Sequence, residues 1–160
     1  MSTEKYNTHL ASEFYVLSAL HRLGAEATLT LGNRKAVDIV VVQEAGKSVT
    51  IDVKGLAGTT SWPVDTVKER PNHFLVFVCF KNRIADLTAV PEVYVVPSER
   101  VEEFTYSSPK GRKTVELSWL RKGEGPKFKD AWDLILHAPA VPALPKRKVK
   151  NAKQAKRVPN

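Results

Sequence analysis

The sequence contains a single cysteine, Cys79, among its 160 residues. One cysteine cannot form an intramolecular disulfide, and it supplies too few thiolates for a cysteine-rich metal site. Because it stands within the apolar run Phe74–Phe80, we expect it to be a small buried core residue. The shortage of cysteine therefore predicts an intracellular, cytoplasmic protein that is stabilised by its core rather than by cross-links.

Long hydrophobic segments are also missing. No apolar run approaches the roughly 20 residues that a membrane-spanning helix needs. The polar N-terminal sequence MSTEKYNTHL has no apolar segment of the kind found in secretory signals. An apolar share of 42% and a charged share of 26% are those of an ordinary globular protein. We expect one folded domain over residues 1–140 and no membrane partner.

Acidic residues are absent from the end of the chain. Seven of the 25 Lys and Arg residues lie between Lys146 and Asn160, so the rest of the chain has 18 basic against 17 acidic residues and is nearly neutral. Proline and the lack of aromatic residues predict that residues 141–160 form a flexible basic tail. This tail either binds nucleic-acid phosphates, which would associate the protein with the nucleoid, or only increases solubility. The basic residues that open the tail are Lys146, Arg147, Lys148 and Lys150.

Hydrophobic periodicity predicts a helix and then a β-hairpin in the first third of the sequence. Apolar residues recur every three or four positions from His9 to Leu23, with Thr8 as the N-cap and Gly24 as the C-terminal stop. The strands predicted after this helix are Ala27–Leu31, Ala36–Gln43 and Ser48–Lys54. A tight turn around Ala45-Gly46 joins the last two strands into the hairpin.

The remaining segments predict a covered sheet with short helices. A polar loop from Gly55 to Asp65 is followed by the apolar run Phe74–Phe80, which is typical of a strand buried on both faces. The later predicted elements are a strand at Val93–Val96, a helical turn at Glu99–Phe104 capped by Ser98, a strand or loop at Val115–Leu120, and a short helix at Lys129–Leu136. This order predicts an α/β or α+β domain with a central mixed sheet flanked by helices.

Two aspartates and a lysine share one face of the predicted hairpin. When Asp38 is placed opposite Asp52, the other face pairs only apolar residues: Val37 with Val53, Ile39 with Ile51, and Val41 with Val49. A register of the other parity would put charges into this apolar face, which is strongly unfavourable when the face is buried. Lys54 follows two residues after Asp52 and projects from the same side. Because Val40 and Val42 share the charged face, we expect that face to be at least half covered.

These charges suit the hydrolysis of a phosphodiester. Two carboxylates can hold Mg²⁺ or Mn²⁺ and leave positions for water and a phosphate oxygen. Lys54 can then orient or deprotonate the attacking water. Glu13, at the edge of the apolar stripe of the first helix, is a third carboxylate that could reach the same place. The alternative is a structural ion pair between Lys54 and one of the aspartates.

The segment from Asp38 through Asp52-Val53-Lys54 resembles the signature of the PD-(D/E)XK nuclease superfamily, which has the restriction-endonuclease-like fold. The preceding helix with Glu13 is similar to that of its archaeal Holliday-junction-resolvase-like branch. The resemblance implies a metal held by Glu13, Asp38, Asp52 and the carbonyl of Val53. It further implies that Lys54 is the catalytic lysine, that Lys68 faces a phosphate, that DNA is the substrate, and that the protein is a homodimer.

Other residues have weaker assignments. Arg34 and Lys35, just before the hairpin, either meet phosphate or lie in a solvated loop. We expect Trp62 to pack over the sheet rather than to stack on a base. The four histidines have no ligand spacing, so we expect surface or half-buried imidazoles rather than metal ligands.

The function predicted from these observations is a Mg²⁺- or Mn²⁺-dependent DNA endonuclease, with branched or junction DNA as one expected substrate. Two alternatives remain open. One is a catalytically silent nucleic-acid-binding protein of the same fold, and the other is an adaptor whose basic tail binds RNA or an acidic protein. The complete set of Glu13, Asp38, Asp52 and Lys54 favours the enzyme, because a silent relative has no need to keep all four.

Overall fold

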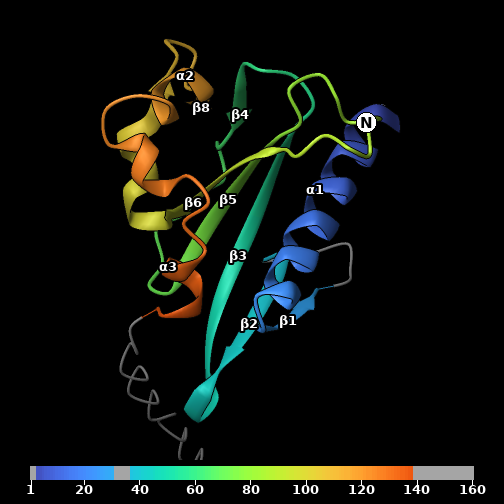
Figure 1. The fold of residues 1–160 in the computed structure, drawn as a ribbon. Helices are drawn as coiled ribbons and strands as arrows, with labels where there is room; N and C mark the ends of the chain where they lie inside the picture. The colour runs from blue at the N-terminus through green and yellow to red at the C-terminus, as the bar shows by residue number, and fades with distance from the viewer. Residues whose placement is uncertain (1–2, 31–36, 139–160) are drawn as a thin grey trace, which may run out of the picture.

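The computed structural model of the protein describes residues 3–30 and 37–138. A five-stranded mixed sheet with the order β1-β2-β3-β5-β6 forms its centre, and a three-stranded sheet with the order β4-β8-β7 lies beside it (Figure 1). The strands are β1 Glu26–Leu29, β2 Ile39–Gln43, β3 Lys47–Leu56, β4 Ser61–Pro63, β5 His73–Cys79, β6 Glu92–Pro97, β7 Thr105–Ser107 and β8 Lys113–Glu116. The helices are α1 Thr3–Arg22, α2 Leu117–Leu120 and α3 Asp133–Leu136, with the 3₁₀ helices η1 Glu44–Gly46, η2 Ser98–Phe104 and η3 Gly125–Phe128. The predicted architecture, a central mixed sheet flanked by helices, is confirmed.

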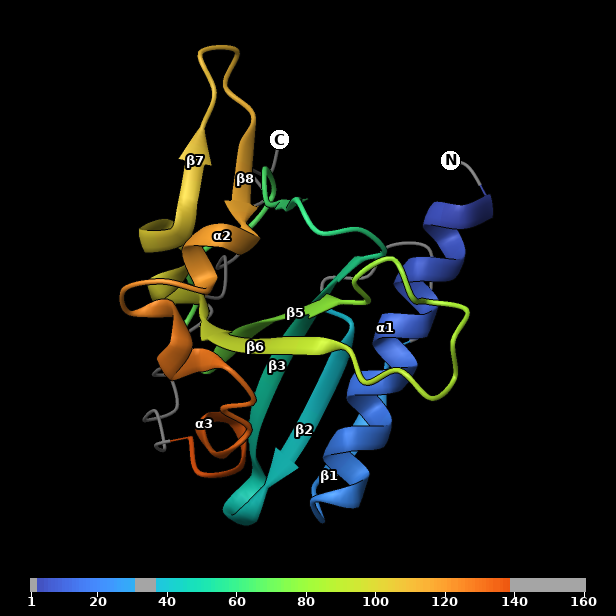
Figure 2. The ribbon, with the colours of Figure 1, turned by 45° about the horizontal axis from the view of Figure 1, so that its top comes forward.

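Helix α1 covers one face of the central sheet (Figures 1 and 2). Its Val16 and Leu20 are completely buried in a core cluster that includes the apolar residues of β2 and β3. Close approach of the helix requires the glycine at position 55, because a Cβ there would lie 2.3 Å from the Ser12 Oγ atom. The helix therefore lies directly on the C-terminal half of β3.

The small sheet, α2, η2 and η3 cover the opposite face (Figure 2). Trp62 of β4 is completely buried in this layer, where its ring centroid lies 5.2 Å from that of Phe77 and its indole N–H donates to the Val78 carbonyl at 3.4 Å. The packing role predicted for Trp62 is thus confirmed. Strand β5 lies between the two layers and is buried at every position, as its continuous apolar sequence predicts.

The predicted hairpin register is also confirmed. The observed pairs of β2 and β3 include Ile39–Ile51 and Val41–Val49, and both lie in the core under α1. On the other side of β3, Asp52 lies beside Leu75 of the parallel strand β5, and Lys54 lies beside Phe77. Leu75 and Phe77 belong to the second core cluster, so Asp52 and Lys54 project from the face that carries the small sheet.

This charged face is covered less than expected. Val40 is half-buried, but Val42 is 48% exposed. The second core cluster takes its central-sheet residues from β5 and β6 and includes none from β2. The expectation of a half-covered face is therefore wrong at the far end of β2, because the covering layer does not reach that strand.

Several predicted boundaries differ from the structure. Helix α1 begins at Thr3, so Thr8 is a buried residue within the helix and not its N-cap. The polar first turns of this helix carry no apolar periodicity that would reveal them. The segment Gly55–Asp65, predicted as a loop, contains the end of β3 and all of β4. The segment Val115–Leu120 is divided between β8 and α2.

The last helix, α3, is shorter than the predicted Lys129–Leu136. Asp130 has a φ of 49°, which lies in the left-handed region and interrupts a right-handed helix at that position. The helix therefore begins only at Asp133, and its Ile135 is buried in the core under α1.

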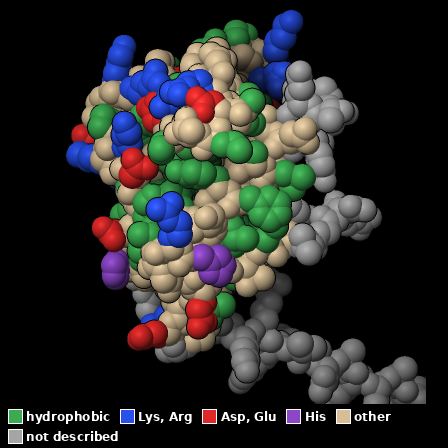
Figure 3. All heavy atoms as spheres, turned by 45° about the vertical axis from the view of Figure 1, so that its right-hand side comes forward, with side chains coloured by type: hydrophobic (Ala, Val, Ile, Leu, Met, Phe, Trp, Pro, Cys, Tyr) green, Lys and Arg blue, Asp and Glu red, His purple; other side chains and the backbone are tan. Residues whose placement is uncertain are grey.

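No helix within residues 3–30 and 37–138 combines the length and the hydropathy that crossing a membrane requires. The α1 side of the molecule shows hydrophobic side chains across its middle, and Phe14 of α1 is 56% exposed (Figure 3). Lys and Arg side chains gather toward the upper end of this view, which is the end at which β3 terminates in Figure 1.

Candidate functional site

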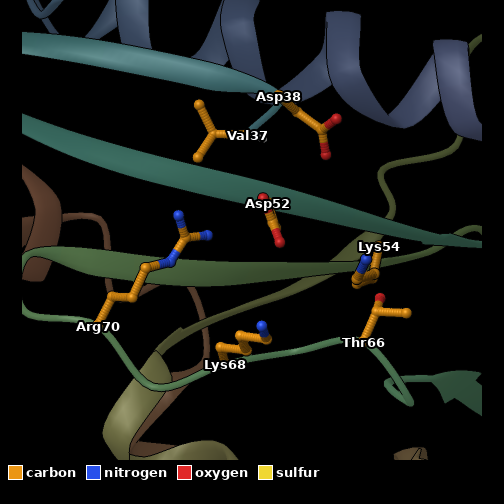
Figure 4. Close-up of a pocket in the computed structure, with 7 residues that line it drawn as sticks. All are labelled: Val37, Asp38, Asp52, Lys54, Thr66, Lys68 and Arg70. Atoms are coloured by element: carbon orange, nitrogen blue, oxygen red, sulfur yellow. The ribbon is translucent and has the colours of Figure 1, made fainter. Parts of the chain in front are cut away.

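Two walls of unlike charge enclose a cavity of about 390 Å³ (Figure 4). The residues just before β2 and those in the middle of β3 form the acidic wall. The other wall is the irregular segment 64–72 between β4 and β5, which we call the strap. The cavity is lined by Val37, Asp38, Asp52, Lys54, Thr66, Lys68 and Arg70. Figure 4 shows the side chains of Lys68 and Arg70 extending from the strap toward the strands that carry the two aspartates.

Asp38 directly precedes β2, and its carboxylate is held in place by β3. Its Oδ2 atom accepts a hydrogen bond from the backbone N–H of Val53 at 2.7 Å. Burial raises the pKa of Asp38, and the neighbouring charges of Glu13 and Asp52 raise it further, although the bond from Val53 opposes this shift. The fold therefore fixes this carboxylate where its negative charge is unfavourable, and a bound cation would relieve that cost.

Asp52 of β3 has a different environment. The Oδ2 atom of Asp52 lies 3.7 Å from Nε2 of His73, and Nδ1 of the same ring is 2.8 Å from the Thr50 Oγ1 atom. Burial alone would raise the pKa of Asp52, but the nearby His73 ring and the charges of Lys54 and Arg70 outweigh it and lower the pKa. Of the two aspartates, Asp52 is thus the one whose surroundings favour the ionised form.

Lys54 completes the acidic wall without neutralising it by direct contact. Within residues 3–30 and 37–138, no ion pair joins its ammonium group to Asp38 or Asp52, although its charge lowers the pKa of both. The predicted alternative, a structural ion pair of Lys54 with an aspartate, is therefore not formed. Lys54 and both aspartates line one cavity, as the hairpin register predicts.

Glu13 is close to this site but outside the cavity lining. It belongs to α1, the helix that packs on β3, and only 7% of its surface is exposed. Its charge contributes to the raised pKa of Asp38, which places it within electrostatic reach of that carboxylate. A role for Glu13 as an outer ligand of a metal or of its water stays a prediction.

The strap is held by individual hydrogen bonds at both ends. At its start, the Val64 N–H donates to the Lys113 carbonyl at 3.0 Å, and Asp65 Oδ1 accepts from the Lys113 N–H at 2.6 Å. Near its end, the buried Ser98 hydroxyl donates to the Arg70 carbonyl at 2.8 Å and accepts from the Arg70 N–H at 2.9 Å. The prediction that Ser98 caps η2 is therefore wrong. Ser98 instead fixes the part of the strap that presents Arg70.

The donor set suits a hard divalent ion that keeps most of its water. Within the described parts of the chain, no three His, Cys, Asp or Glu side chains come close enough to form a preformed metal cluster. Mg²⁺ does not need one, because it commonly binds through one or two carboxylates, several waters and substrate phosphate oxygens. Asp38 and Asp52, with their opposite pKa shifts, would supply the two carboxylates. The residues present therefore fit Mg²⁺ or Mn²⁺ and do not fit a closed structural zinc site.

Two residues of the site were not recognised from the sequence. His73 is 1% exposed and contacts Asp52, whereas we expected a surface or half-buried imidazole. The available signal was its position at the start of a strand parallel to β3, which pairs it with Thr50. Arg70 lies in an irregular segment and offers no comparable pattern.

The remaining predicted residues lie outside the described part of the chain. These are Arg34, Lys35, Lys146, Arg147, Lys148 and Lys150. Lys68, which was expected to face a phosphate, does line the cavity.

Comparisons with known proteins give a match in structure only. No protein-family model and no curated protein sequence matches the chain. Among solved structures, the chain is similar to a bacterial homing endonuclease, I-Ssp6803I, with a TM-score of 0.56 over 85% of this chain and 92% of that one. Sequence identity is 17%, so the similarity concerns the fold. The chain thus has the fold of a known endonuclease.

Proposed function

We propose that the protein is a divalent-metal-dependent endonuclease that hydrolyses DNA phosphodiester bonds. One observation carries the proposal: Asp38, Asp52 and Lys54 face the cations of the strap across a single cavity. A phosphodiester needs negative ligands for a metal on one side and positive donors for its own oxygens on the other. The two walls have this complementarity.

The charged residues of the cavity, and His73 beside it, have roles in the proposed reaction. Asp38 and Asp52 would hold the metal, which when bound supplies water of lowered pKa and a counter-charge for the phosphate. Lys54 would orient the attacking water or accept its proton. Lys68 and Arg70 would bind the non-bridging phosphate oxygens, whose charge grows as the bond breaks. His73 would keep Asp52 in position through its contact with the carboxylate.

Two further observations support DNA as the substrate. The residues Asp38 and Asp52-Val53-Lys54 resemble the signature of the PD-(D/E)XK superfamily, and the helix with Glu13 is similar to that of its Holliday-junction-resolvase-like branch. The chain also shares its fold with an enzyme described as a homing endonuclease. Cutting both strands of a duplex or a junction requires two active sites, so we infer that the active assembly is a homodimer.

Cleavage assays test this proposal directly. Wild-type protein would be incubated with plasmid, branched, single-stranded DNA and RNA in Mg²⁺, Mn²⁺ or EDTA. We expect metal-dependent internal cleavage of DNA that EDTA abolishes, and we expect Asp52→Asn to lower the rate by about 10³-fold or more, since the substitution removes a metal ligand.

Asp133→Asn is the matched control, because this exposed aspartate makes the same change of charge in α3, away from the cavity. It should cleave at the wild-type rate. Equal activity of Asp52→Asn and wild-type protein, or cleavage that survives EDTA, would contradict the proposal. DNA binding without cleavage under every condition would instead support the catalytically silent alternative.

A further inference from the structure

A second cavity, of about 460 Å³, lies next to the charged one. It is bounded by the N-terminal half of α1, the end of β3, the residues that follow β3, and β4. Leu56, Ala57, Trp62 and Pro63 give it an apolar lining, and His9 and Ser61 add polar groups. Lys54 lines both cavities, so the two spaces meet at the residue proposed to act on the attacking water.

The wall of this second cavity is built in advance of any ligand. Three backbone carbonyls of the segment 56–58 accept hydrogen bonds from the end of β5 and the turn after it. The donors are the Phe80 N–H to Leu56 at 2.9 Å, the Asn82 N–H to Ala57 at 2.7 Å, and the Cys79 thiol to Gly58 at 3.1 Å. A site fixed in this way loses little freedom when it binds a ligand.

The size and lining of the cavity fit a flat, mostly apolar ring with polar edges. A volume of about 460 Å³ lies within the range of small-ligand sites, which combine apolar walls with a few polar groups. A nucleobase has this chemistry, and in a DNA strand it is covalently linked to the phosphate that the charged cavity would hold. Completely buried Trp62 forms part of the wall rather than an exposed stacking surface.

We propose that this cavity, lined by Lys54, Leu56, Gly58 and Ser61, receives the unpaired nucleobase adjacent to the cleaved phosphodiester bond. The inference rests on the proposed nuclease function and names its substrate class: DNA whose nucleotide at the cleavage site is unpaired or extruded. A base that is stacked and paired must first leave the duplex, which costs free energy, whereas an unpaired base enters without that cost. Single-stranded and branched DNA are therefore favoured over regular duplex.

Gly58→Leu is designed to add a bulky side chain at a residue that lines the cavity, with little effect on the fold. A Cβ at this position meets only the Asn82 Oδ1 atom, at the ordinary contact distance of 3.6 Å, and Gly58 has no positive φ that would disfavour a side chain. Thr59→Leu adds a leucine at the next residue, which is exposed and does not line the cavity, and serves as the control. Thermal melting of both variants verifies that they are folded.

The cleavage site is first mapped on a single-stranded oligonucleotide, and matched oligonucleotides are then made with an abasic nucleotide on either side of that bond. We expect Gly58→Leu to lower kcat/KM for the normal oligonucleotide by at least about tenfold, the scale of steric exclusion from a pocket. On the oligonucleotide abasic at the flanking position, wild-type protein and Gly58→Leu should be equal. Equal losses on normal and abasic DNA, or no loss on either, would overturn the proposal.

Binding separates this inference from the nuclease proposal. With 2-aminopurine at the flanking position, or at each position of the oligonucleotide in turn if no cleavage is found, and with Ca²⁺ in place of Mg²⁺, wild-type protein and Thr59→Leu should change the fluorescence of the base, and Gly58→Leu should not. If the wild-type protein cleaves nothing but shows this fluorescence pattern, the nuclease proposal fails and the base site stands. If it cleaves DNA but the base fluorescence is the same in all three proteins, the base site fails alone.

Discussion

The two walls of the charged cavity are built by different means. The acidic wall is part of a regular sheet, in which the pairs Ile39–Ile51 and Val41–Val49 fix the side from which Asp52 and Lys54 project. The strap belongs to no β-sheet and has no repeating backbone hydrogen bonds. Its position depends on a few separate hydrogen bonds, including two between Ser98 and Arg70. A wall held by repeating backbone pairs is rigid, whereas a wall held by separate hydrogen bonds can be loosened by single substitutions.

This difference suggests that the two walls have different roles in the proposed reaction. The chemistry requires fixed positions, because small displacements of reacting groups are costly, and the sheet supplies these. Phosphate binding tolerates more freedom, and the strap supplies Lys68 and Arg70 for it. We therefore expect substitutions in the sheet to lower the rate of cleavage and substitutions in the strap to weaken DNA binding.

Among the substitutions that compare the two walls, the largest effect is expected for Lys54→Met. The substitution keeps an unbranched side chain but removes the group proposed to orient or deprotonate water, a role that contributes about 10²–10⁴-fold to rate. Single-turnover cleavage at saturating DNA should fall by this factor. Lys110→Met, at an exposed position outside both cavities, should leave the rate unchanged. A weaker affinity with an unchanged rate would move Lys54 from the chemistry to phosphate binding.

A smaller effect is expected for Lys68→Ala and Arg70→Ala in the strap. Each should weaken DNA binding by about tenfold at moderate salt, because each removes a cation proposed to bind a phosphate oxygen. On duplex DNA, the slope of log affinity against log salt should become shallower by about 0.9 for each phosphate that is no longer neutralised. Fluorescence anisotropy across a salt series measures both quantities. An unchanged slope would remove these side chains from the phosphate-binding wall.

Ser98→Ala tests whether the strap depends on single hydrogen-bonding partners. The substitution leaves the N–H and the carbonyl of Arg70 without their buried partner, which should lower the free energy of unfolding by about 1–3 kcal/mol. DNA affinity should fall less than in Arg70→Ala, because the cation is kept but held less firmly. Ser107→Ala, at an exposed position in β7, is the control. Urea denaturation and anisotropy check these expectations, and an unaltered stability would contradict the role assigned to Ser98.

The smallest effect concerns the metal-free protein and follows from the pKa of Asp38. Because this pKa is raised in the folded state by burial and by the charges of Glu13 and Asp52, its contribution to stability is present below the unfolded pKa of about 3.9 and is lost as pH rises through the folded pKa. At neutral pH the ionised carboxylate therefore destabilises the fold. Asp38→Asn cannot ionise but can still accept the bond from Val53.

We thus expect Asp38→Asn to melt at a higher temperature than wild-type protein at pH 7 in EDTA, and the difference to vanish below about pH 3.9. Adding Mg²⁺ should raise the Tm of wild-type protein and not that of the variant, because only the former keeps both metal-binding carboxylates. A lower Tm for Asp38→Asn at pH 7 would show that the carboxylate is not strained by its neighbours.

The comparison of the walls also explains what the sequence could predict. In a regular hairpin, successive side chains point to opposite faces. The apolar pairs on one face therefore predicted that Asp52 and Lys54 share the other face. The strand β5 was recognisable as buried on both faces because its apolar run is continuous. In both segments the local pattern contains the information that fixes the structure.

The strap and the small sheet were not predictable in this way. Trp62 pairs with Val115, more than 50 residues away in the chain, and neither short strand has enough residues to show a period. The hydrogen bonds of Ser98 with Arg70 join two irregular segments, and hydroxyl groups beside helical turns are usually interpreted as caps. Interactions between distant irregular segments leave no periodic signal, so the basic wall of the cavity required the structure.

The central claim is that Asp38 and Asp52 together hold a divalent metal, and the position of Mn²⁺ in a crystal tests it most directly. Crystals grown with Mn²⁺ and measured at a wavelength that excites its anomalous scattering should show a peak about 2.1 Å from a carboxylate oxygen of each aspartate, on the acidic wall and facing the strap across the cavity. Asp52→Asn crystals grown in the same way should lose or weaken the peak. A cavity without anomalous density at millimolar Mn²⁺, or a peak at an unrelated surface site only, would contradict the claim.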